Sequence, residues 1–91
     1  MIYKIVVTKK AQKELDKLPA RVADKIADEI EKLAENPRPN GYKKLTEFRI
    51  PHAPRELYRI RIGDYRAVYS IEDDVLTVQV FKVANRKEIY E

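Results

Sequence analysis

Three arginines lie close together in an otherwise largely apolar stretch, YRIRIGDYRAVYSI, which covers residues 58–71. Arg59, Arg61 and Arg66 each carry a planar guanidinium, whose paired N–H groups match the oxygens of a phosphate or a carboxylate. Tyrosines and isoleucines alternate with them, as in a strand that buries one face. The stretch therefore predicts either an anion-binding surface or a solvated face neutralised by Glu72, Glu88 or a partner's carboxylate.

The Gly-Asp pair inside this stretch predicts its geometry. A two-residue hairpin turn with glycine at its first central position would join the strands on either side. Arg61 would then face Arg66, and Arg59 would face Val68, all on one side of the sheet. Like charges opposite each other across a sheet cost a few tenths of a kcal/mol to about 1 kcal/mol. A bound anion would reverse this cost, so the register favours a phosphate site.

A second hairpin is expected next, with the two adjacent aspartates at positions 73 and 74 as its turn. Ile71 would then face Leu76, and Arg66 would face Phe81. The Phe81 ring would either stack on an unpaired base or pack under the C-terminal tail. Two adjacent acids in a turn do not make a metal site without further ligands.

The rest of the chain predicts the elements that position these strands. Residues 2–7 are β-branched and aromatic, which favours a strand, and Thr8 is placed to cap the helix that follows. A longer amphipathic helix is expected over residues 21–35, and the sequence NPRPNG ends it. Residues 42–56 are irregular, with room for one short strand near residues 45–50. The expected order is thus β-α-α-β-β-β, with a short C-terminal helix left open.

This order predicts an α+β fold. Two N-terminal helices would pack on one face of a mainly antiparallel four-stranded sheet, and the other face would be open to solvent or to a partner. Ninety-one residues suit a single domain, residues 1–91, with one core and little room for a deep cavity.

The amino-acid composition limits the kinds of catalytic and metal sites that the chain can form. The chain has no cysteine and one histidine, which argues against thiol catalysis and against a cysteine- or histidine-rich metal site, and we expect neither a metal nor a cofactor. The net charge is +4, and residues 41–66 carry seven Lys/Arg against three Asp/Glu. This local excess predicts either a footprint for a phosphate backbone or only a solvated face. No signal peptide or membrane span is recognisable, so the cytoplasm is the default location.

The sequence resembles one known family over nearly its whole length. The phrases YRIRIGDYRAVY and VANRKEIY, together with KKAQKELDKLP and ENPRPNGYKKL near the N-terminus, are similar to the RelE toxins of the RelE/ParE superfamily. The resemblance implies a ribosome-dependent endonuclease that cleaves mRNA in the ribosomal A site. Attack of a 2′-hydroxyl on the adjacent phosphate would give a 2′,3′-cyclic phosphate and a 5′-hydroxyl, without a metal ion.

The resemblance also implies roles for individual residues. The catalytic set would be Arg61, Arg66, Arg86 and Tyr90, with cationic groups that stabilise the phosphorane-like transition state. The groups expected to contact RNA or phosphate are Arg59, Lys43, Lys44 and Phe81. Arg59 and Arg61 occupy positions where well-known members of the family have lysine.

The partners implied are a RelB-like antitoxin, the ribosome and mRNA, with no membrane; a toxin–antitoxin heterotetramer is one assembly that the resemblance allows. Two other functions stay open at this point. One is a ParE-like toxin that poisons DNA gyrase, and the other is a catalytically weak homologue that only binds RNA or an antitoxin.

Overall fold

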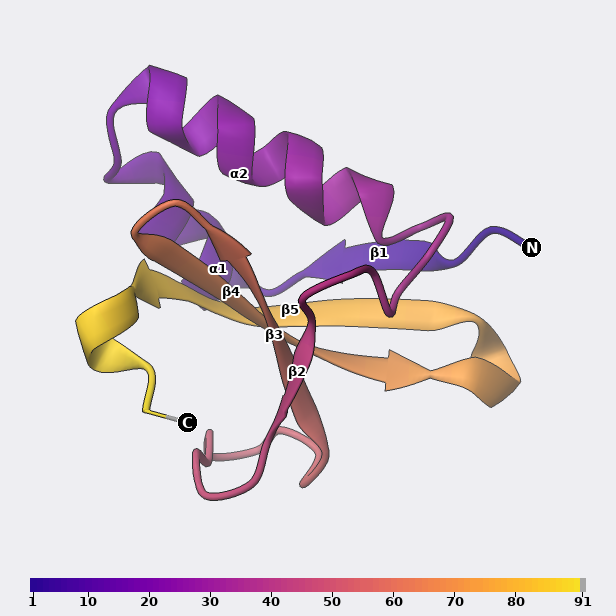
Figure 1. Ribbon diagram of the computed structural model, residues 1–91. Coiled ribbons are helices and arrows are strands. Elements are labelled where there is room, and N and C mark those ends of the chain that lie inside the picture. The colour runs from indigo at the N-terminus through magenta and orange to yellow at the C-terminus, as the bar shows by residue number, and fades with distance from the viewer. Residues whose placement is uncertain (91) are drawn as a thin grey trace.

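The computed structural model describes residues 1–90, which form two helices and one five-stranded sheet (Figure 1). The strands are β1 (Lys4–Val7), β2 (Lys43–Leu45), β3 (Leu57–Ile62), β4 (Tyr65–Glu72) and β5 (Thr77–Asn85), and the helices are α1 (Lys9–Asp16) and α2 (Ala20–Lys32). The strand order is β1-β5-β4-β3-β2, with β1 parallel to β5 and the other pairs antiparallel. The α+β class is confirmed, with β2 as one strand more than the four expected.

Local signals explain where the two helices begin and end. The Thr8 hydroxyl accepts a hydrogen bond from the Ala11 N–H at 3.2 Å, which confirms Thr8 as the cap of α1. Pro19, in an extended conformation, directly precedes α2. The backbone N–H of Leu33 donates to the Ile30 carbonyl at 3.0 Å, so this bond spans three residues instead of the four of an α-helix. The helix therefore ends at Lys32, earlier than the predicted end at residue 35.

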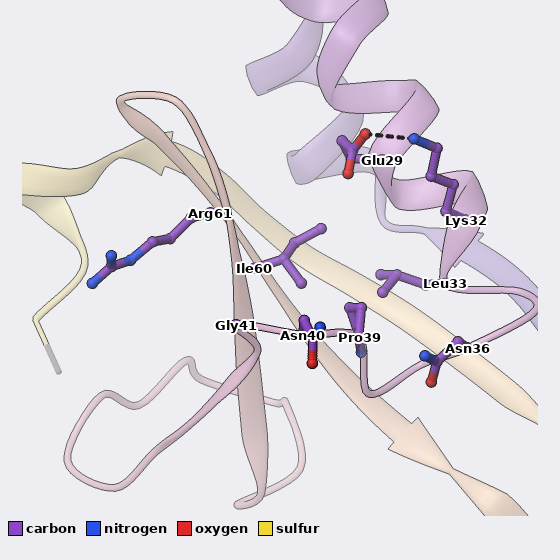
Figure 2. A pocket seen from close by; sticks show the side chains of 9 residues that line it. All are labelled: Glu29, Lys32, Leu33, Asn36, Pro39, Asn40, Gly41, Ile60 and Arg61. Atoms are coloured by element: carbon purple, nitrogen blue, oxygen red, sulfur yellow. Dashed lines mark hydrogen bonds and ion pairs between the residues drawn. The ribbon is translucent and has the colours of Figure 1, made fainter.

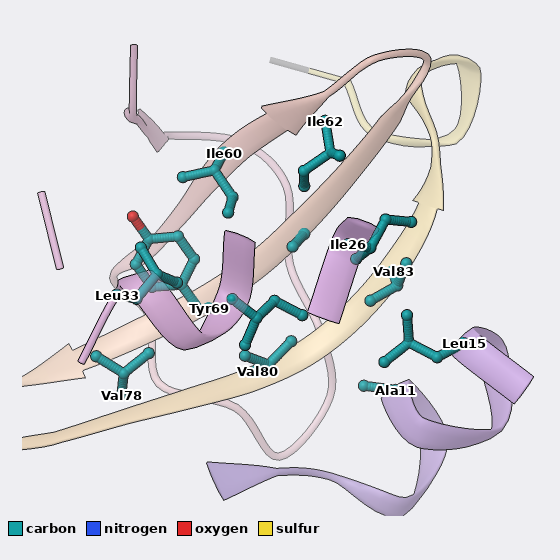
Figure 3. Close-up of a cluster of buried hydrophobic side chains, with 12 residues drawn as sticks. Ala11, Leu15, Ile26, Leu33, Ile60, Ile62, Tyr69, Val78, Val80 and Val83 are labelled. Carbon is teal, nitrogen blue, oxygen red and sulfur yellow. The ribbon is translucent and has the colours of Figure 1, made fainter. Parts of the chain in front are cut away.

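The helices cover one face of the sheet and form the first hydrophobic cluster (Figure 3). The buried members are Ala11, Leu15, Ile26, Ile30, Leu33, Ile60, Ile62, Ala67, Tyr69, Val78, Val80 and Val83. Burial of one such Leu, Ile or Val side chain contributes about 1.5–3 kcal/mol. The cluster therefore fixes which face of β3, β4 and β5 points to the helices.

The first hairpin has the predicted register. Gly63 has a φ of 59°, a value that favours glycine, at the turn between β3 and β4. Arg61 pairs with Arg66 and Arg59 pairs with Val68, as the two-residue turn predicted. The Gly-Asp turn therefore determines which side chains share a face of this hairpin.

The second hairpin differs from its predicted register. Asp73–Val75 forms a 3-10 turn and Leu76 adopts a φ of 45°, so the connection is longer than two residues. Ile71 therefore pairs with Val78 instead of Leu76. A bulge follows in the ladder between β4 and β5, and Arg66 pairs with Ala84 instead of Phe81. The prediction failed because the sequence marks a turn there without revealing its length or the extra residue in β5.

The second face of the sheet is not open, which corrects the predicted layer structure. Leu45, Phe48, Leu57, Val68, Ala84 and Ile89 form a second hydrophobic cluster, with Ile50, Ala53 and Phe81 packed against it. The cover comes from the irregular segment 46–56 and from the C-terminal residues that follow β5, where Arg86–Glu88 forms a short 3-10 turn. Neither segment has a periodic pattern from which this packing could be predicted. Within residues 1–90, no helix has the length and apolar character needed to cross a membrane.

Candidate functional site

The cationic side chains of β3 and β4 share the face of the sheet that lies opposite the helices. Arg61 pairs with Arg66, which in turn pairs with Ala84, so these three form one row across the sheet. Lys43 pairs with Arg59 in the next row. Because side chains of directly paired residues point to the same side, we call this surface the arginine face and define it by Lys43, Arg59, Arg61 and Arg66.

Arg66 is buried and braces the hairpin turn. It is 7% exposed, and its Nη1 donates to the carbonyl oxygens of Gly63 at 3.0 Å and Tyr65 at 2.9 Å. These bonds hold the guanidinium beside the turn, within the row that also contains Arg61. Arg66 therefore adds positive charge to the arginine face although it is buried, and it also stabilises the turn.

Arg59 is also buried, at 2% exposure, and its Nη1 donates to the Gly41 carbonyl oxygen at 2.7 Å. The expectation that all three arginines would lie on an open surface is therefore wrong for Arg59 and Arg66. The physical reason is the second hydrophobic cluster, because its apolar side chains cover the same face. The arginine face is thus a partly covered surface rather than a solvated one.

Three predicted catalytic residues remain accessible. Arg61 is exposed, and Figure 2 shows its side chain extending away from α2, on the side where the C-terminal segment runs. Arg86 has a side chain that is 61% exposed, with its Nε 4.0 Å from an Asp64 carboxylate oxygen, and its backbone N–H bonds the Asp64 carbonyl at 2.8 Å. Tyr90 is 59% exposed and packs edge-on against Phe48, with 5.1 Å between ring centroids.

The remaining predicted contact residues divide between the two sides of the sheet. Lys43 is exposed and lies on the arginine face beside Arg59. Lys44 points to the other side, and its Nζ lies 3.5 Å from a Glu56 carboxylate oxygen. Phe81 packs against the second hydrophobic cluster, as the packing alternative predicted. The structure therefore brings Lys43 to the arginines but not Lys44.

A pocket of about 230 Å³ lies on the helix side of β3 (Figure 2). Leu33 and Ile60 provide apolar walls, while Asn36, Asn40 and Gly41 line it from the loop after α2. Arg61 also lines the pocket, although its side chain extends away from it, so the pocket borders the arginine face along β3 (Figure 2). Among residues 1–90, no group of three or more His, Asp or Glu side chains is arranged to hold a metal ion.

An ion-pair cluster that the sequence did not reveal lies at the turn after β4. Arg38 donates to both carboxylate oxygens of Asp73, at 3.2 and 2.8 Å, and the Tyr3 hydroxyl donates to the same carboxylate. These hydrogen bonds lower the pKa of Asp73 to about 2, and the bonds from Arg38 have a larger effect than the bond from Tyr3. The same contact with Asp73 raises the pKa of Tyr3. The three residues lie far apart in the chain, so their spacing gave no signal.

Comparison with known proteins shows which family this chain belongs to. A profile of the family described as "ParE toxin of type II toxin-antitoxin system, parDE" matches residues 5–90. Toxin RelE of Mycobacterium tuberculosis is 28% identical over 89 residues, which cover 97% of this chain and 86% of that protein.

Solved structures agree with the sequence comparison. The chain matches one in the archaeal RelE-RelB complex from Pyrococcus horikoshii with a TM-score of 0.78 and 26% identity, over 98% of this chain and 100% of the other. It also matches the intact E. coli RelBE toxin-antitoxin complex with a TM-score of 0.66 and 25% identity, over 91% and 95% of the two chains. The chain therefore belongs to the ParE toxin family of type II toxin–antitoxin systems and is a RelE-like toxin of the RelE/ParE superfamily.

Proposed function

We propose that this toxin is an endoribonuclease that cleaves mRNA in the ribosomal A site and so inhibits translation. The observation that carries the proposal is the position of Arg61, Arg86 and Tyr90. All three are exposed, and Arg61 lies next to the buried Arg66 in the cross-strand row. Exposed guanidinium groups can bind the oxygens of a phosphate directly, and the buried cations beside them raise the local potential.

The proposed reaction is a transfer of the phosphate within the RNA. The 2′-oxygen bonds to the adjacent phosphorus and the bond from phosphorus to the 5′-oxygen breaks, leaving a 2′,3′-cyclic phosphate and a 5′-hydroxyl. Negative charge grows on the phosphate oxygens in the transition state, where Arg61 and Arg86 would stabilise it. Tyr90 would stack on a nucleotide or assist transfer of the proton from the 2′-hydroxyl to the leaving oxygen. The scheme assigns no step to a metal ion.

A RelB-like antitoxin is the proposed protein partner. The related structures from P. horikoshii and E. coli are complexes of RelE with RelB. An acidic or amphipathic antitoxin segment would neutralise the cations of the arginine face, and a toxin–antitoxin heterotetramer is the assembly to look for. Co-purification of a small protein encoded beside this toxin would test the pairing.

The test of the nuclease is induction of the protein in cells, with mapping of mRNA ends on translated messages. We expect cuts in the wild type and a loss of cuts in Arg61→Ala and Tyr90→Phe. Arg21→Ala is the matched control, because Arg21 is an exposed arginine on α2 and lies away from the arginine face. Growth arrest that is the same in all four proteins would contradict the site assignment.

The family description favours one alternative, because the matching profile is named for ParE. A ParE-like toxin would bind DNA gyrase and leave mRNA intact. Growth arrest with DNA breaks and uncut mRNA would therefore show that the protein is a gyrase inhibitor and not a nuclease. Antitoxin binding without either lesion would indicate a catalytically weak homologue.

A further inference from the structure

The orientation of Arg59 depends on a loop that is distant from it in sequence. The loop covers residues 36–42, between α2 and β2, and we call it the 36–42 loop. Its Gly41 carbonyl accepts a hydrogen bond of 2.7 Å from Arg59 Nη1. Gly41 has a φ of 87°, which favours glycine because a Cβ atom would strain that backbone conformation. The direction of the Gly41 carbonyl therefore helps to set the direction of the Arg59 guanidinium.

Packing holds the two ends of this loop: Pro37 is buried, and Tyr42 packs against the first hydrophobic cluster, with its ring centroid 5.8 Å from that of Tyr58. Pro39, Asn40 and Gly41 line the pocket of about 230 Å³ whose opposite walls are Leu33 and Ile60 (Figure 2). Side chains that border a cavity have few van der Waals contacts across it. The middle of the loop, residues 38–41, must therefore depend on interactions other than packing across the pocket.

Two polar contacts hold the first half of the loop to the sheet. The buried Tyr69 hydroxyl donates to the Pro37 carbonyl oxygen at 2.8 Å. The next residue, Arg38, is bound by both oxygens of the Asp73 carboxylate, at 3.2 and 2.8 Å. A planar fork bound at two points fixes orientation as well as distance. The loop is thus tied to β4 through Tyr69 and to the turn after β4 through Asp73.

We propose that Tyr69, Arg38 and Asp73 are positioning residues for the arginine face. They hold the 36–42 loop in place, so that the Gly41 carbonyl orients the guanidinium of Arg59. The same loop leads directly into β2, so it also sets the place of Lys43 beside Arg59. The orientation itself is a property of the fold, whereas its consequence for RNA cleavage rests on the proposed function.

Rotation of the Arg59 side chain tests the orientation without any assay of activity. We would measure, by NMR of the guanidinium nitrogens, the rate of rotation about the bond between Nε and Cζ of Arg59. Arg38→Gln and Tyr69→Phe should raise this rate by roughly tenfold, the change expected when a charge-assisted hydrogen bond is weakened. Arg38 and Asp73 have side chains 41% and 56% exposed, so Arg38→Gln tests the proposal even if Tyr69→Phe does not fold.

Lys32→Gln is the matched control. Lys32 lines the same pocket, and its side chain forms an exposed ion pair with Glu29 at 2.9 Å. Its backbone carbonyl accepts from the Asn36 N–H at 3.3 Å, a bond that Lys32→Gln keeps, whereas its side chain makes no hydrogen bond to the loop among residues 1–90. Faster rotation in Arg38→Gln but not in Lys32→Gln supports the proposal. An unchanged rate in Arg38→Gln, or an equal increase in both variants, overturns it.

A double-mutant cycle for RNA cleavage then tests the consequence. If Arg38 acts chiefly through Arg59, Arg38→Gln should slow cleavage in the wild-type background and cause a much smaller further loss in Arg59→Ala, where only its effect on Lys43 remains. Equal losses in both backgrounds would overturn the positioning role. If the wild type does not cleave RNA, the proposed function is wrong, and the NMR rates alone support or overturn the orientation of Arg59 by the loop.

Discussion

The arginines of the central hairpin differ in what surrounds them, although one sequence pattern contains all three. Arg61 is exposed, whereas Arg59 and Arg66 are buried and bonded to backbone carbonyls. A buried guanidinium that bonds backbone oxygens contributes to the fold as well as to the local potential. Loss of activity alone would therefore not identify a substrate contact at Arg59 or Arg66.

Stability measurements should separate the two kinds of arginine. Arg66→Ala should lower the free energy of unfolding by about 2 kcal/mol, because it leaves the Gly63 and Tyr65 carbonyls without this charged donor. Arg61→Ala should change it by less than about 0.5 kcal/mol and still reduce cleavage by about 100-fold. Urea unfolding and a cleavage assay on the same samples would check both. A large loss of stability in Arg61→Ala would show that its charge is structural.

The lowered pKa of the Asp73 carboxyl should make the stability of the protein depend on pH. The pKa of this carboxyl is lowered from 3.8 to about 2, chiefly by the hydrogen bonds from Arg38 and then by that from Tyr3. A carboxyl whose pKa is lower in the folded than in the unfolded state adds to the free energy of unfolding. This contribution is complete at pH values above the unfolded pKa, and it disappears as the pH falls through the folded pKa. Asp73→Asn should therefore be less stable than the wild type at pH 5–7, and the two should converge between about pH 4 and pH 2.

Urea unfolding of both proteins across this pH range would test the assignment, with Asp74→Asn as the control. Asp74 is the adjacent exposed aspartate in the same 3-10 turn. A wild-type advantage over Asp73→Asn that persists unchanged at pH 2 would mean that Asp73 does not titrate in this way.

Among the elements, α1 and β5 are joined by one carboxylate. Glu14 of α1 accepts from the Lys82 ammonium at 3.1 Å and from the Val83 N–H at 2.8 Å. The two charged side chains are only 22% and 19% exposed, so water screens their interaction less than at the surface. These contacts lie next to Phe81, where β5 departs from regular pairing with β4. The carboxylate therefore stabilises β5 where its ladder is disrupted.

Removal of this carboxylate should be costly for the fold. Glu14→Ala should lower the free energy of unfolding by about 2 kcal/mol, since it leaves the Val83 N–H and the Lys82 charge without their acceptor. Glu14→Gln keeps a neutral acceptor and should cost about half as much. Glu29→Ala removes the exposed pair with Lys32 and should cost less than about 0.5 kcal/mol. Equal losses for Glu14→Ala and Glu29→Ala in urea unfolding would contradict the buried role of Glu14.

The two hairpins show which elements the sequence could predict. The Gly63 turn was predictable in register, because few backbone conformations fit a two-residue connection. The turn after β4 was not, because its 3-10 segment ends at Leu76 in a conformation that leucine rarely adopts. The position of Phe81 against the second cluster was still predicted as one alternative, although its pairing was wrong. Local turn chemistry thus predicted one register but could not predict the bulge in the other.

At the scale of the whole molecule, the sheet separates two hydrophobic clusters of different construction. The first cluster is formed with two regular helices, and the second is covered by the segment 46–56 and the residues after β5. The sequence predicted the first cluster from its helical periodicity. It could not predict the second, because Phe48 and Ile89 lie in segments without a periodic pattern and their contact depends on the complete fold.

This difference predicts that the second cluster opens locally, whereas the first holds the molecule together. Ile89 is 3% exposed, but it lies after the last strand, in a short segment that can detach without breaking the sheet. Ile89→Ala should therefore speed amide hydrogen exchange in residues 46–56 and 86–90 and leave β4 and β5 protected.

Ile26→Ala is the matched comparison, because Ile26 belongs to α2 and is fully buried in the first cluster. It should lower the free energy of unfolding by about 2–4 kcal/mol and speed exchange in β4 and β5 as well. Equal effects of the two variants on every strand would show that both clusters unfold as one unit. If exchange in Ile89→Ala rises only around the second cluster, the cover over Arg59 and Arg66 can open while the sheet that positions them stays folded.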